Sequence, residues 1–157
     1  MRSMKKALFA VAVESVFTND NTDAAAYYKQ GNAYADQGDY DRAIADYSEA
    51  LRLDSNLAGV YNNRGVAYYK KEDYDRAVAD YNEALRLDPN DALAYNNRGN
   101  AYRNKGDYDR AIADYAQALR LDPNLAATYY NRVLAYDDQG EYTLARADWE
   151  KALQLDS

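Results

Sequence analysis

A repeat of fixed period organises most of this chain. The string Asp-Tyr-Asp-Arg-Ala begins at Asp39, Asp73 and Asp107, and each copy is followed by a similar run of Ala, Tyr and Leu residues. A fourth, weaker copy keeps Tyr142 and an aromatic residue, Trp149, in register. A fixed period of this length is the signature of small supersecondary units that pack on their neighbours. The repeat therefore predicts a stack of like units.

Each unit predicts a pair of helices. The four units cover residues 24–57, 58–91, 92–125 and 126–157. In the first unit Tyr27, Gly31 and Tyr34 are spaced by four and then three residues, which places them on one face of a helix over about 24–37. Gly38 suits a left-handed helix end, and Asp39 suits the N-cap of a second helix. The sequence predicts an all-α chain of four helix–turn–helix units.

The unit resembles the tetratricopeptide repeat family, a helix–turn–helix with the pattern W-x2-L-G-x2-Y, then A-x3-F, then P. The matching residues are Tyr27, Gln30, Gly31, Tyr34, Ala43, Tyr47 and Ser55 in the first unit, Tyr61, Arg64, Gly65, Tyr68, Ala77, Tyr81 and Pro89 in the second, and Tyr95, Arg98, Gly99, Tyr102, Ala111, Tyr115 and Pro123 in the third. The fourth unit departs most, with Val133 for the glycine and Trp149 for the second aromatic residue. The resemblance covers about 24–157 and implies a right-handed α-solenoid that acts as a scaffold or adaptor.

Some positions depart from the family pattern or carry charge. The position before the glycine, leucine in the family, holds Gln30, Arg64, Arg98 and Arg132. We expect these side chains to lay their stems on the core and to keep their polar heads in water. Arg42 and Asp46 are four residues apart and are expected to pair on the surface. Glu72 replaces the glycine that ends the first helix of the other units, and a left-handed conformation there should cost about 1 kcal/mol.

Residues 1–23 precede the repeats and resemble a secretion signal in outline, with basic residues before the apolar run 7–13. Glu14 interrupts the run and no small-residue cleavage site follows, so we predict a cytoplasmic location, with an exported or periplasmic one as the alternative. The run is too short to span a bilayer, and no integral membrane span is predicted. Helical spacing places four apolar side chains together: Phe9, Val13, Val16 and Phe17. We predict an extra N-terminal amphipathic helix that packs on the first unit or on another chain.

Composition excludes several kinds of chemistry. The chain has no Cys and no His, which removes disulfides, thiolate nucleophiles, zinc fingers and the usual proton shuttle at neutral pH. The acidic side chains recur as helix caps and do not form a calcium loop, and the phosphate-binding and nucleophile motifs are missing. A net charge of −7 opposes nucleic-acid binding. We predict a protein that is not an enzyme and that has no metal site, no cofactor and no nucleic-acid partner.

The family resemblance implies that the first helices of the units line a concave groove for a peptide or helix of a partner protein. The residues expected there are Tyr28, Asn32, Asn62, Asn63, Tyr69, Asn96, Asn97, Asn100, Arg103, Tyr130, Asn131 and Leu134. An amide both donates and accepts hydrogen bonds, so asparagines repeated once in every unit can pair with the backbone of an extended peptide. The alternative is that Asn63, Asn97 and Asn131 are surface residues or bond to the neighbouring helix. Both roles are open at the level of the sequence.

One subset of the family grips a C-terminal carboxylate with two asparagines and three cationic side chains. Asn32 and Asn63 match the asparagines. Tyr28, Leu93 and Asn97 stand where the cations would be, so this carboxylate clamp is not expected.

The units differ in charge. They hold, in order, 3 basic and 6 acidic residues, 5 and 7, 5 and 4, and 3 and 6, which gives net charges of −3, −2, +1 and −3. A partner with basic ends and a neutral or acidic middle suits this distribution. The sequence stops at Ser157, directly after the second helix of the fourth unit, and solenoids usually have a polar cap at each end. The alternative function is therefore a self-assembling module, natural or consensus-designed, that forms homo-oligomers through the C-terminal unit or the N-terminal segment.

Overall fold

The computed structural model describes residues 22–156, which are helical apart from short turns. Residues 22–36 form the first helix. The helices that follow are α2 (Tyr40–Leu53), α3 (Ala58–Lys70), α4 (Tyr74–Leu87), α5 (Ala92–Asn104), α6 (Tyr108–Leu121), α7 (Ala126–Gln139) and α8 (Tyr142–Leu155). The amphipathic helix predicted for the N-terminal segment falls, up to residue 21, outside the described residues.

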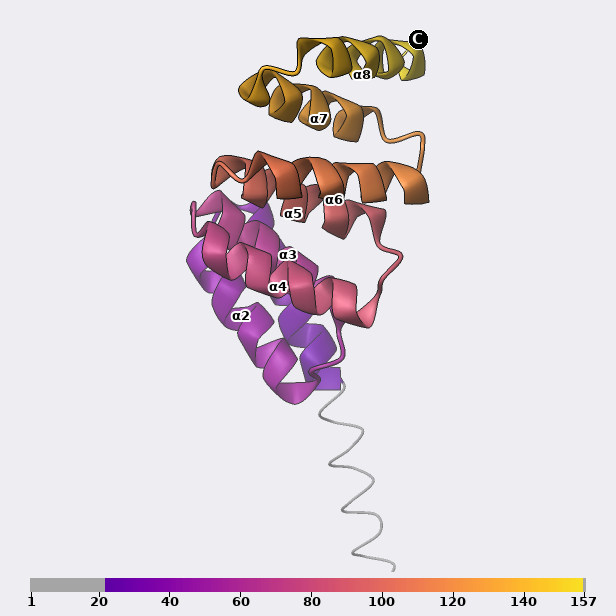
Figure 1. Ribbon diagram of the computed structural model, residues 1–157. Helices are drawn as coiled ribbons and strands as arrows, with labels where there is room; N and C mark the ends of the chain where they lie inside the picture. The colour runs from indigo at the N-terminus through magenta and orange to yellow at the C-terminus, as the bar shows by residue number, and fades with distance from the viewer. Residues whose placement is uncertain (1–21, 157) are drawn as a thin grey trace, which may run out of the picture.

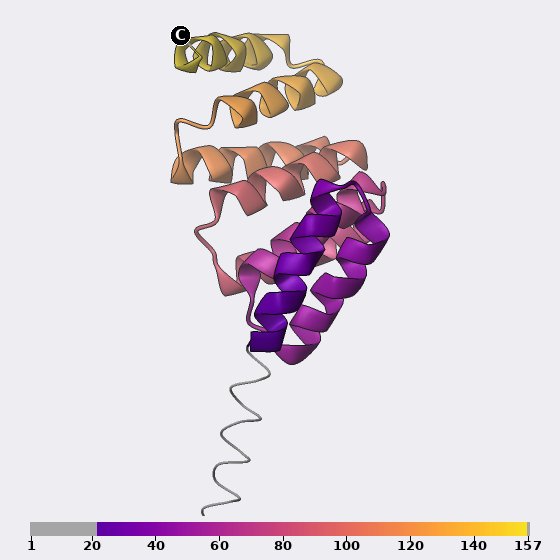
Figure 2. The ribbon, with the colours of Figure 1, turned by 180° about the vertical axis from the view of Figure 1, so that it is seen from behind.

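The helices stack in chain order as four helix–turn–helix units, with the first helix and α8 at opposite ends (Figures 1 and 2). Each helix packs chiefly on the one before it and the one after it, and α5 also touches α3 and α7. We call the first helix, α3, α5 and α7 the A helices, and α2, α4, α6 and α8 the B helices. The all-α stack of four helix–turn–helix units predicted from the period, and the right-handed solenoid implied by the family resemblance, are confirmed over the described residues.

The turn inside each of the first three units is fixed by the aspartate that begins the B helix. The carboxylates of Asp39, Asp73 and Asp107 accept hydrogen bonds from the backbone N–H groups three residues later, at 3.1, 3.2 and 3.3 Å. Such N-caps satisfy amide groups that have no partner within the helix. Gly38 ends the first helix in the left-handed region, at φ 76°. Glu72 occupies the same place at φ 61°, so the predicted left-handed glutamate is confirmed.

A tyrosine from each of the first three B helices packs against the glycine of its own A helix. Tyr47, Tyr81 and Tyr115 are at most 1% exposed. A Cβ atom added to Gly31, Gly65 or Gly99 would lie 2.7 Å from a ring atom of that tyrosine. The glycine is therefore required by the close approach of an aromatic ring, which explains why the two residue types recur together.

The fourth unit changes both members of this contact. Val133 replaces the glycine and is buried, whereas Trp149 replaces the tyrosine and is 44% exposed. The indole packs beside the Tyr130 ring instead, with the ring centroids 5.9 Å apart. We attribute the outward position of Trp149 to the valine side chain, which fills space that a tyrosine ring occupies in the other units.

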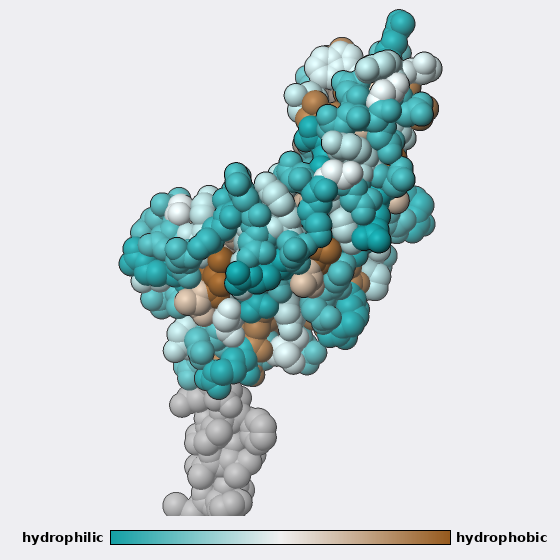
Figure 3. All heavy atoms as spheres, turned by 60° about the vertical axis from the view of Figure 1, so that its left-hand side comes forward, coloured by the Kyte–Doolittle hydropathy of each residue, from teal (hydrophilic) through white to brown (hydrophobic). Residues whose placement is uncertain are grey.

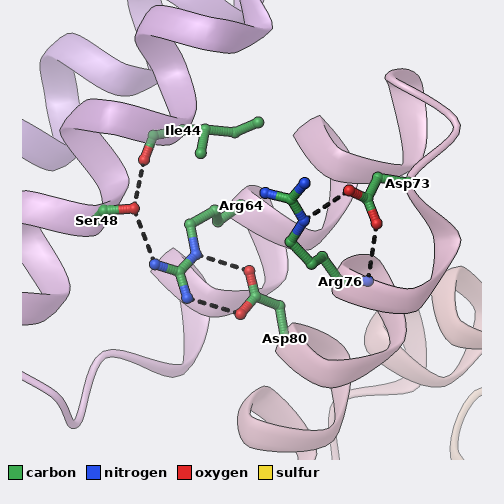
Figure 4. A network of polar contacts seen from close by, with 6 residues as sticks. All are labelled: Ile44, Ser48, Arg64, Asp73, Arg76 and Asp80. Atoms are coloured by element: carbon green, nitrogen blue, oxygen red, sulfur yellow. Dashed lines mark hydrogen bonds and ion pairs between the residues drawn. The ribbon is translucent and has the colours of Figure 1, made fainter.

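An ion pair joins the two helices of each of the last three units. Arg64 donates from Nε and Nη2 to the carboxylate of Asp80, at 2.7 and 2.8 Å, and its Nη1 reaches Ser48 of α2 (Figure 4). The pairs Arg98–Asp114 and Arg132–Asp148 have the same geometry. The three aspartates are at most 7% exposed. The expectation that these arginines keep their heads in water was wrong, because a buried carboxylate lies within reach.

The first unit lacks this ion pair because Gln30 stands at the arginine position. Asp46 occupies the carboxylate position, and its Oδ2 is buried without a hydrogen-bond partner among the described residues. Burial raises the pKa of Asp46. The predicted surface pair between Arg42 and Asp46 was also wrong, since Arg42 bonds instead to Asp39, at 2.5 Å.

Candidate interaction groove

Hydrogen bonds between successive A helices engage most of the asparagines predicted to line the groove. Asn97 donates from Nδ2 to Oδ1 of Asn62, at 3.2 Å, and Asn131 donates to Oδ1 of Asn96, at 3.0 Å. The residues of each pair are 35 positions apart, so each bond links one unit to the next. We call these contacts the asparagine rungs. They match the alternative in which the asparagines bond to the neighbouring helix.

The rung between the first two units has a different acceptor. Asn63 donates from Nδ2 to the hydroxyl of Tyr28, at 3.1 Å, and to Oδ1 of Asn32, at 3.0 Å. Both N–H groups of the amide are thereby used, because an asparagine side chain has two. That these asparagines bind a peptide stays a prediction. A bound peptide would have to use the side-chain donors and acceptors that the asparagine rungs do not engage.

Two further predicted residues accept hydrogen bonds from the buried tyrosines of their own units. Asn32 accepts from the hydroxyl of Tyr47, at 2.8 Å, and Asn100 from that of Tyr115, at 2.7 Å. Burial raises the pKa of Tyr47 to about 12 and also raises that of Tyr115. Both phenols are therefore neutral hydrogen-bond donors at physiological pH, and they orient the two amides.

The predicted residues one turn further along also bridge successive A helices. The hydroxyl of Tyr69 accepts from Nδ2 of Asn104, at 2.6 Å. Arg103 forms an ion pair with Asp138 of α7, at 2.9 Å. The structure thus places Tyr69 and Arg103 in contacts between units, on the same helices as the asparagine rungs.

A hollow of about 340 Å³, lined by both polar and apolar side chains, opens between the first helix, α2 and α3. We call it the N-terminal hollow. Its lining includes Asn32, Asp36, Asn63 and the edge of Tyr47. The predicted residues Asn32 and Asn63 therefore meet in one concavity.

A second hollow, of about 450 Å³, opens between α7 and α8 and is apolar. We call it the C-terminal hollow. It is lined by Tyr130 and Leu134, which were predicted, together with Tyr142 and Trp149, which were not. The sequence signal for Trp149 was present, because the fourth unit departs from the others at Val133 and Trp149, whereas Tyr142 has a tyrosine equivalent in every unit. The sequence alone did not show that aromatic rings are exposed to solvent in this unit.

In the space-filling view apolar residues appear as small separate areas on a mostly hydrophilic face (Figure 3). Over residues 22–156, acidic side chains do not gather in a group suited to a metal ion, and none of the helices is long and apolar enough to cross a membrane. The two hollows lie at opposite ends of the stack, and two more polar ones, of about 400 and 390 Å³, lie at the turns beside Lys105 and Lys71.

Solved structures share this architecture. A crystal structure of MamA superposes with a TM-score of 0.83 at 26% identity, over 91% of this chain and 84% of that one. The second TPR domain of human RPAP3, solved with an HSP70 peptide, gives 0.72 at 28% identity, over 74% of this chain and 97% of that one. The first TPR of Spaghetti (RPAP3), bound to an HSP90 peptide, gives 0.66 at 27% identity, over 81% and 94%. A search of the curated protein sequences finds no significant match.

Two family models match the sequence. One, described as TPR repeat, matches residues 31–72, and another, described as tetratricopeptide repeat, matches residues 62–126 and 96–157. Together with the stacked helix pairs, the Gly–Tyr contact and the capped turns, these matches show that the chain belongs to the tetratricopeptide repeat family of protein–protein interaction modules.

Proposed function

We propose that the chain is a non-enzymatic adaptor that holds a peptide or short helix of a partner protein against its A helices. The observation that carries this proposal is the C-terminal hollow. Inner units close the equivalent region with a buried tyrosine, whereas the fourth unit leaves Trp149 44% and Tyr130 46% exposed. Partly exposed aromatic residues around a concave surface are the usual anchors of protein interfaces.

The partner proposed for this hollow inserts an apolar side chain between Tyr130 and Trp149 and places a cation nearby. Leu134 and Val133 supply the apolar floor, and Asp137 lies at the edge. The fourth unit has a net charge of −3, from 3 basic and 6 acidic residues, which favours a basic segment flanking the anchor. The acidic first unit favours a second basic segment at the N-terminal hollow, where Asp36 lies.

The chemistry of the groove differs from that expected for carboxylate capture. The RPAP3 domains were solved with HSP70 and HSP90 peptides. In this chain Tyr28 and Asn97, at two of the positions where a clamp carries cations, take part in the asparagine rungs. We therefore propose a partner that is recognised by apolar and basic side chains and not by an acidic C-terminus.

The single tryptophan of the chain makes this testable by direct binding. A library of peptides with a central aromatic or leucine anchor, with basic and with acidic flanks, would be titrated while the fluorescence of Trp149 is followed. We expect binding by the peptides with basic flanks, weakened by added salt. Acidic-flanked peptides that bind equally well, or binding that is indifferent to salt, would contradict the proposed charge pattern.

A matched pair of variants separates the hollow from the rest of α7 and α8. Leu134→Asp places a carboxylate in the C-terminal hollow and should abolish binding. Leu144→Asp makes the same change at a leucine of α8 that is 47% exposed and does not line the hollow, and it should bind like the parent chain. Equal binding by both variants would show that the hollow is not the site.

A second candidate function is self-assembly through the end of the stack. Leu153 of α8 is 52% exposed, whereas its equivalents in the other units, Leu51, Leu85 and Leu119, are each 7% exposed. Homo-oligomers formed through this face would be weakened by Leu153→Lys, as measured by light scattering over a range of concentrations. Unchanged mass at every concentration would leave the adaptor as the function.

A further inference from the structure

The first helix exposes a face that the other A helices bury. Ala26 and Ala33 both lie on this face and both are exposed. The residues of the later units that correspond to Ala26 are Val60, Ala94 and Thr128, and they are 2%, 0% and 2% exposed. Those that correspond to Ala33 are Ala67, Ala101 and Ala135, which are 1%, 0% and 0% exposed. This face of the first helix therefore carries small side chains at positions that are buried in helix contacts in the three later units.

In the other units the cover is the preceding B helix. Ala67 of α3 belongs to one buried cluster with Ala43 and Tyr47 of α2. Ala135 of α7 belongs to another with Tyr115 of α6. The natural cover for Ala33 is thus a helix that presents apolar residues at the positions of a B helix, one repeat period before α2.

The segment before the first helix carries those residues in that phase. Counting back one repeat period from the core residues of α2 gives an apolar side chain at each position. They are Phe9 for Ala43, Val13 for Tyr47, Val16 for Ala50 and Phe17 for Leu51. An independent amphipathic helix would show the same spacing but would match the register of the repeat only by coincidence. In the sequence, residues 6–19 therefore correspond position by position to residues 40–53.

Two polar residues of the segment are in phase as well. Glu14 stands at the position of Ser48 and Asn82, whose side-chain oxygens accept hydrogen bonds from Arg64 and Arg98 of the next A helix, at 3.0 and 2.7 Å. The residue of the first helix at that arginine position is Gln30, whose amide can donate to a glutamate. Glu14, which interrupts the apolar run, therefore stands in register at the position of a hydrogen-bond acceptor for Gln30 of the first helix.

The aspartates between units give the remaining match. Asp54, Asp88 and Asp122 each follow a B helix, and their Oδ1 atoms accept from the backbone N–H two residues later, at 2.9, 3.1 and 3.0 Å. Asp20 lies one repeat period before Asp54 and begins the same kind of turn in sequence, followed by Asn21 and Thr22. The segment therefore has an apolar face, an acceptor and a turn residue, all in register with the units.

We propose that residues 6–19 form a helix that packs on the Ala26–Ala33 face of the same chain and closes the N-terminal end of the solenoid. The short link through Asp20 keeps the segment next to its own first helix, and this high effective concentration favours it over a second copy. This inference concerns a surface apart from the two hollows and does not depend on the proposed partner.

The contact differs in one respect from those between the other units. There, an acid at the start of the B helix pairs with the end of the next A helix, as Asp41 does with Lys71 and Asp75 with Lys105. The corresponding residues here are Ala7 and Gln37, which cannot form an ion pair. The proposed contact therefore rests on apolar packing, and Phe9, larger than Ala43, supplies more of it.

Because the chain has no cysteine, an introduced pair reports this contact without background. Val13→Cys combined with Ala33→Cys in the full chain should give an intramolecular cross-link with a short bismaleimide, seen as a monomer whose yield does not change on dilution. The control pair is Val11→Cys with Ala33→Cys, since Val11 corresponds to Ala45, Ala79 and Ala113, which are all exposed. We expect no intramolecular cross-link in this control pair.

Stability provides a second readout. Val13→Asp should lower the melting temperature of the full chain, because it places a carboxylate in the proposed contact, whereas Val11→Asp should leave it unchanged. Cross-linked dimers in place of monomers would overturn the proposal in favour of a contact between two copies. Equal cross-linking of both cysteine pairs, or equal melting of both aspartate variants, would overturn it altogether.

Discussion

The guanidinium of Arg98 donates two hydrogen bonds to the carboxylate of Asp114, at 2.8 and 2.7 Å, across the two helices of one unit. Three units have such a pair, and the first has Gln30 opposite Asp46 instead. A bidentate pair of this kind binds the planar guanidinium in one orientation. The chain thus contains its own comparison between paired carboxylates and a partly buried one, Asp46, whose buried Oδ2 has no partner among the described residues.

Gln30→Arg should stabilise the fold by supplying the partner that Asp46 lacks. The expected gain in the free energy of unfolding is on the order of 1.5–3 kcal/mol, the usual range for hydrogen bonds to a charged group. Urea unfolding would measure it. The double variant Gln30→Arg/Asp46→Asn should lose most of the gain, and a gain that persists in the double variant would mean that the arginine acts through other contacts.

Asp46→Asn should change how stability depends on pH. Burial raises the pKa of Asp46 above its ordinary value of 3.8, so the folded chain holds this proton to a higher pH than the unfolded chain does. The free energy of unfolding therefore falls as the pH rises from 3.8 to the raised pKa. We expect the asparagine variant to be more stable than the parent chain above this range, and the difference to vanish below it.

Urea unfolding of both chains between about pH 3 and pH 7 would show this trend. Asp36→Asn, at an exposed position of the first helix, controls for the loss of one negative charge. A stability difference between parent and Asp46→Asn that is constant across the pH range would contradict the role assigned to the buried carboxylate.

Glu72→Gly should raise the melting temperature, because glutamate is strained at φ 61° and glycine is not. The gain should be about 1 kcal/mol in the free energy of unfolding. Glu72→Ala keeps the Cβ atom and the strain, so it should give little or no gain. If alanine stabilises as much as glycine does, the charge of the glutamate and not its backbone would be the cause.

Two glycines of α3 should respond in opposite directions to alanine. Gly65→Ala would place a Cβ 2.7 Å from the ring of Tyr81 and should cost about 1–3 kcal/mol. Gly59→Ala would meet its nearest neighbour, the hydroxyl of Tyr28, at 3.7 Å, and should stabilise the helix by about 0.5–1 kcal/mol. Thermal unfolding of both variants checks the pair, and a destabilising Gly59→Ala would show that helix propensity does not decide the outcome there.

The fold could be predicted from sequence because its determinants are local and repeated. The cap at Asp39, the left-handed Gly38 and the aromatic Tyr47 act within one unit, and the period shows which residues are equivalent. Even the strained Glu72 could be identified, because three glycines mark the conformation of that position.

The ion pairs were missed because each residue was interpreted alone. Arg64 was interpreted from the leucine that it replaces, and Asp46, the equivalent of Asp80 in the first unit, as a surface partner of Arg42. Their spacing in the sequence recurs in the pairs Arg98–Asp114 and Arg132–Asp148, and the buried acid persists in the first unit where the arginine does not. That recurrence was the available signal.

The hydrogen-bond partners of the groove residues could not be predicted from the sequence, because they depend on how closely neighbouring helices approach. The rung from Asn97 to Asn62 and its equivalent from Asn131 exist because adjacent A helices approach closely, and the residue type alone does not show whether an amide faces a peptide or the next helix. The exposure of Trp149 likewise depends on a neighbour, because Val133 fills the space that a tyrosine ring occupies in the other units.

The placement of the ion pairs bears on how such a chain can change in length. Arg64 and Asp80 both fall inside residues 58–91, so a gene duplication or deletion of one unit copies or removes the whole pair. Such an event never leaves a buried charge stranded without its counterion. Units in which the polar core is complete can be gained or lost without a second, compensating mutation, which suits them to divergence by changes in copy number.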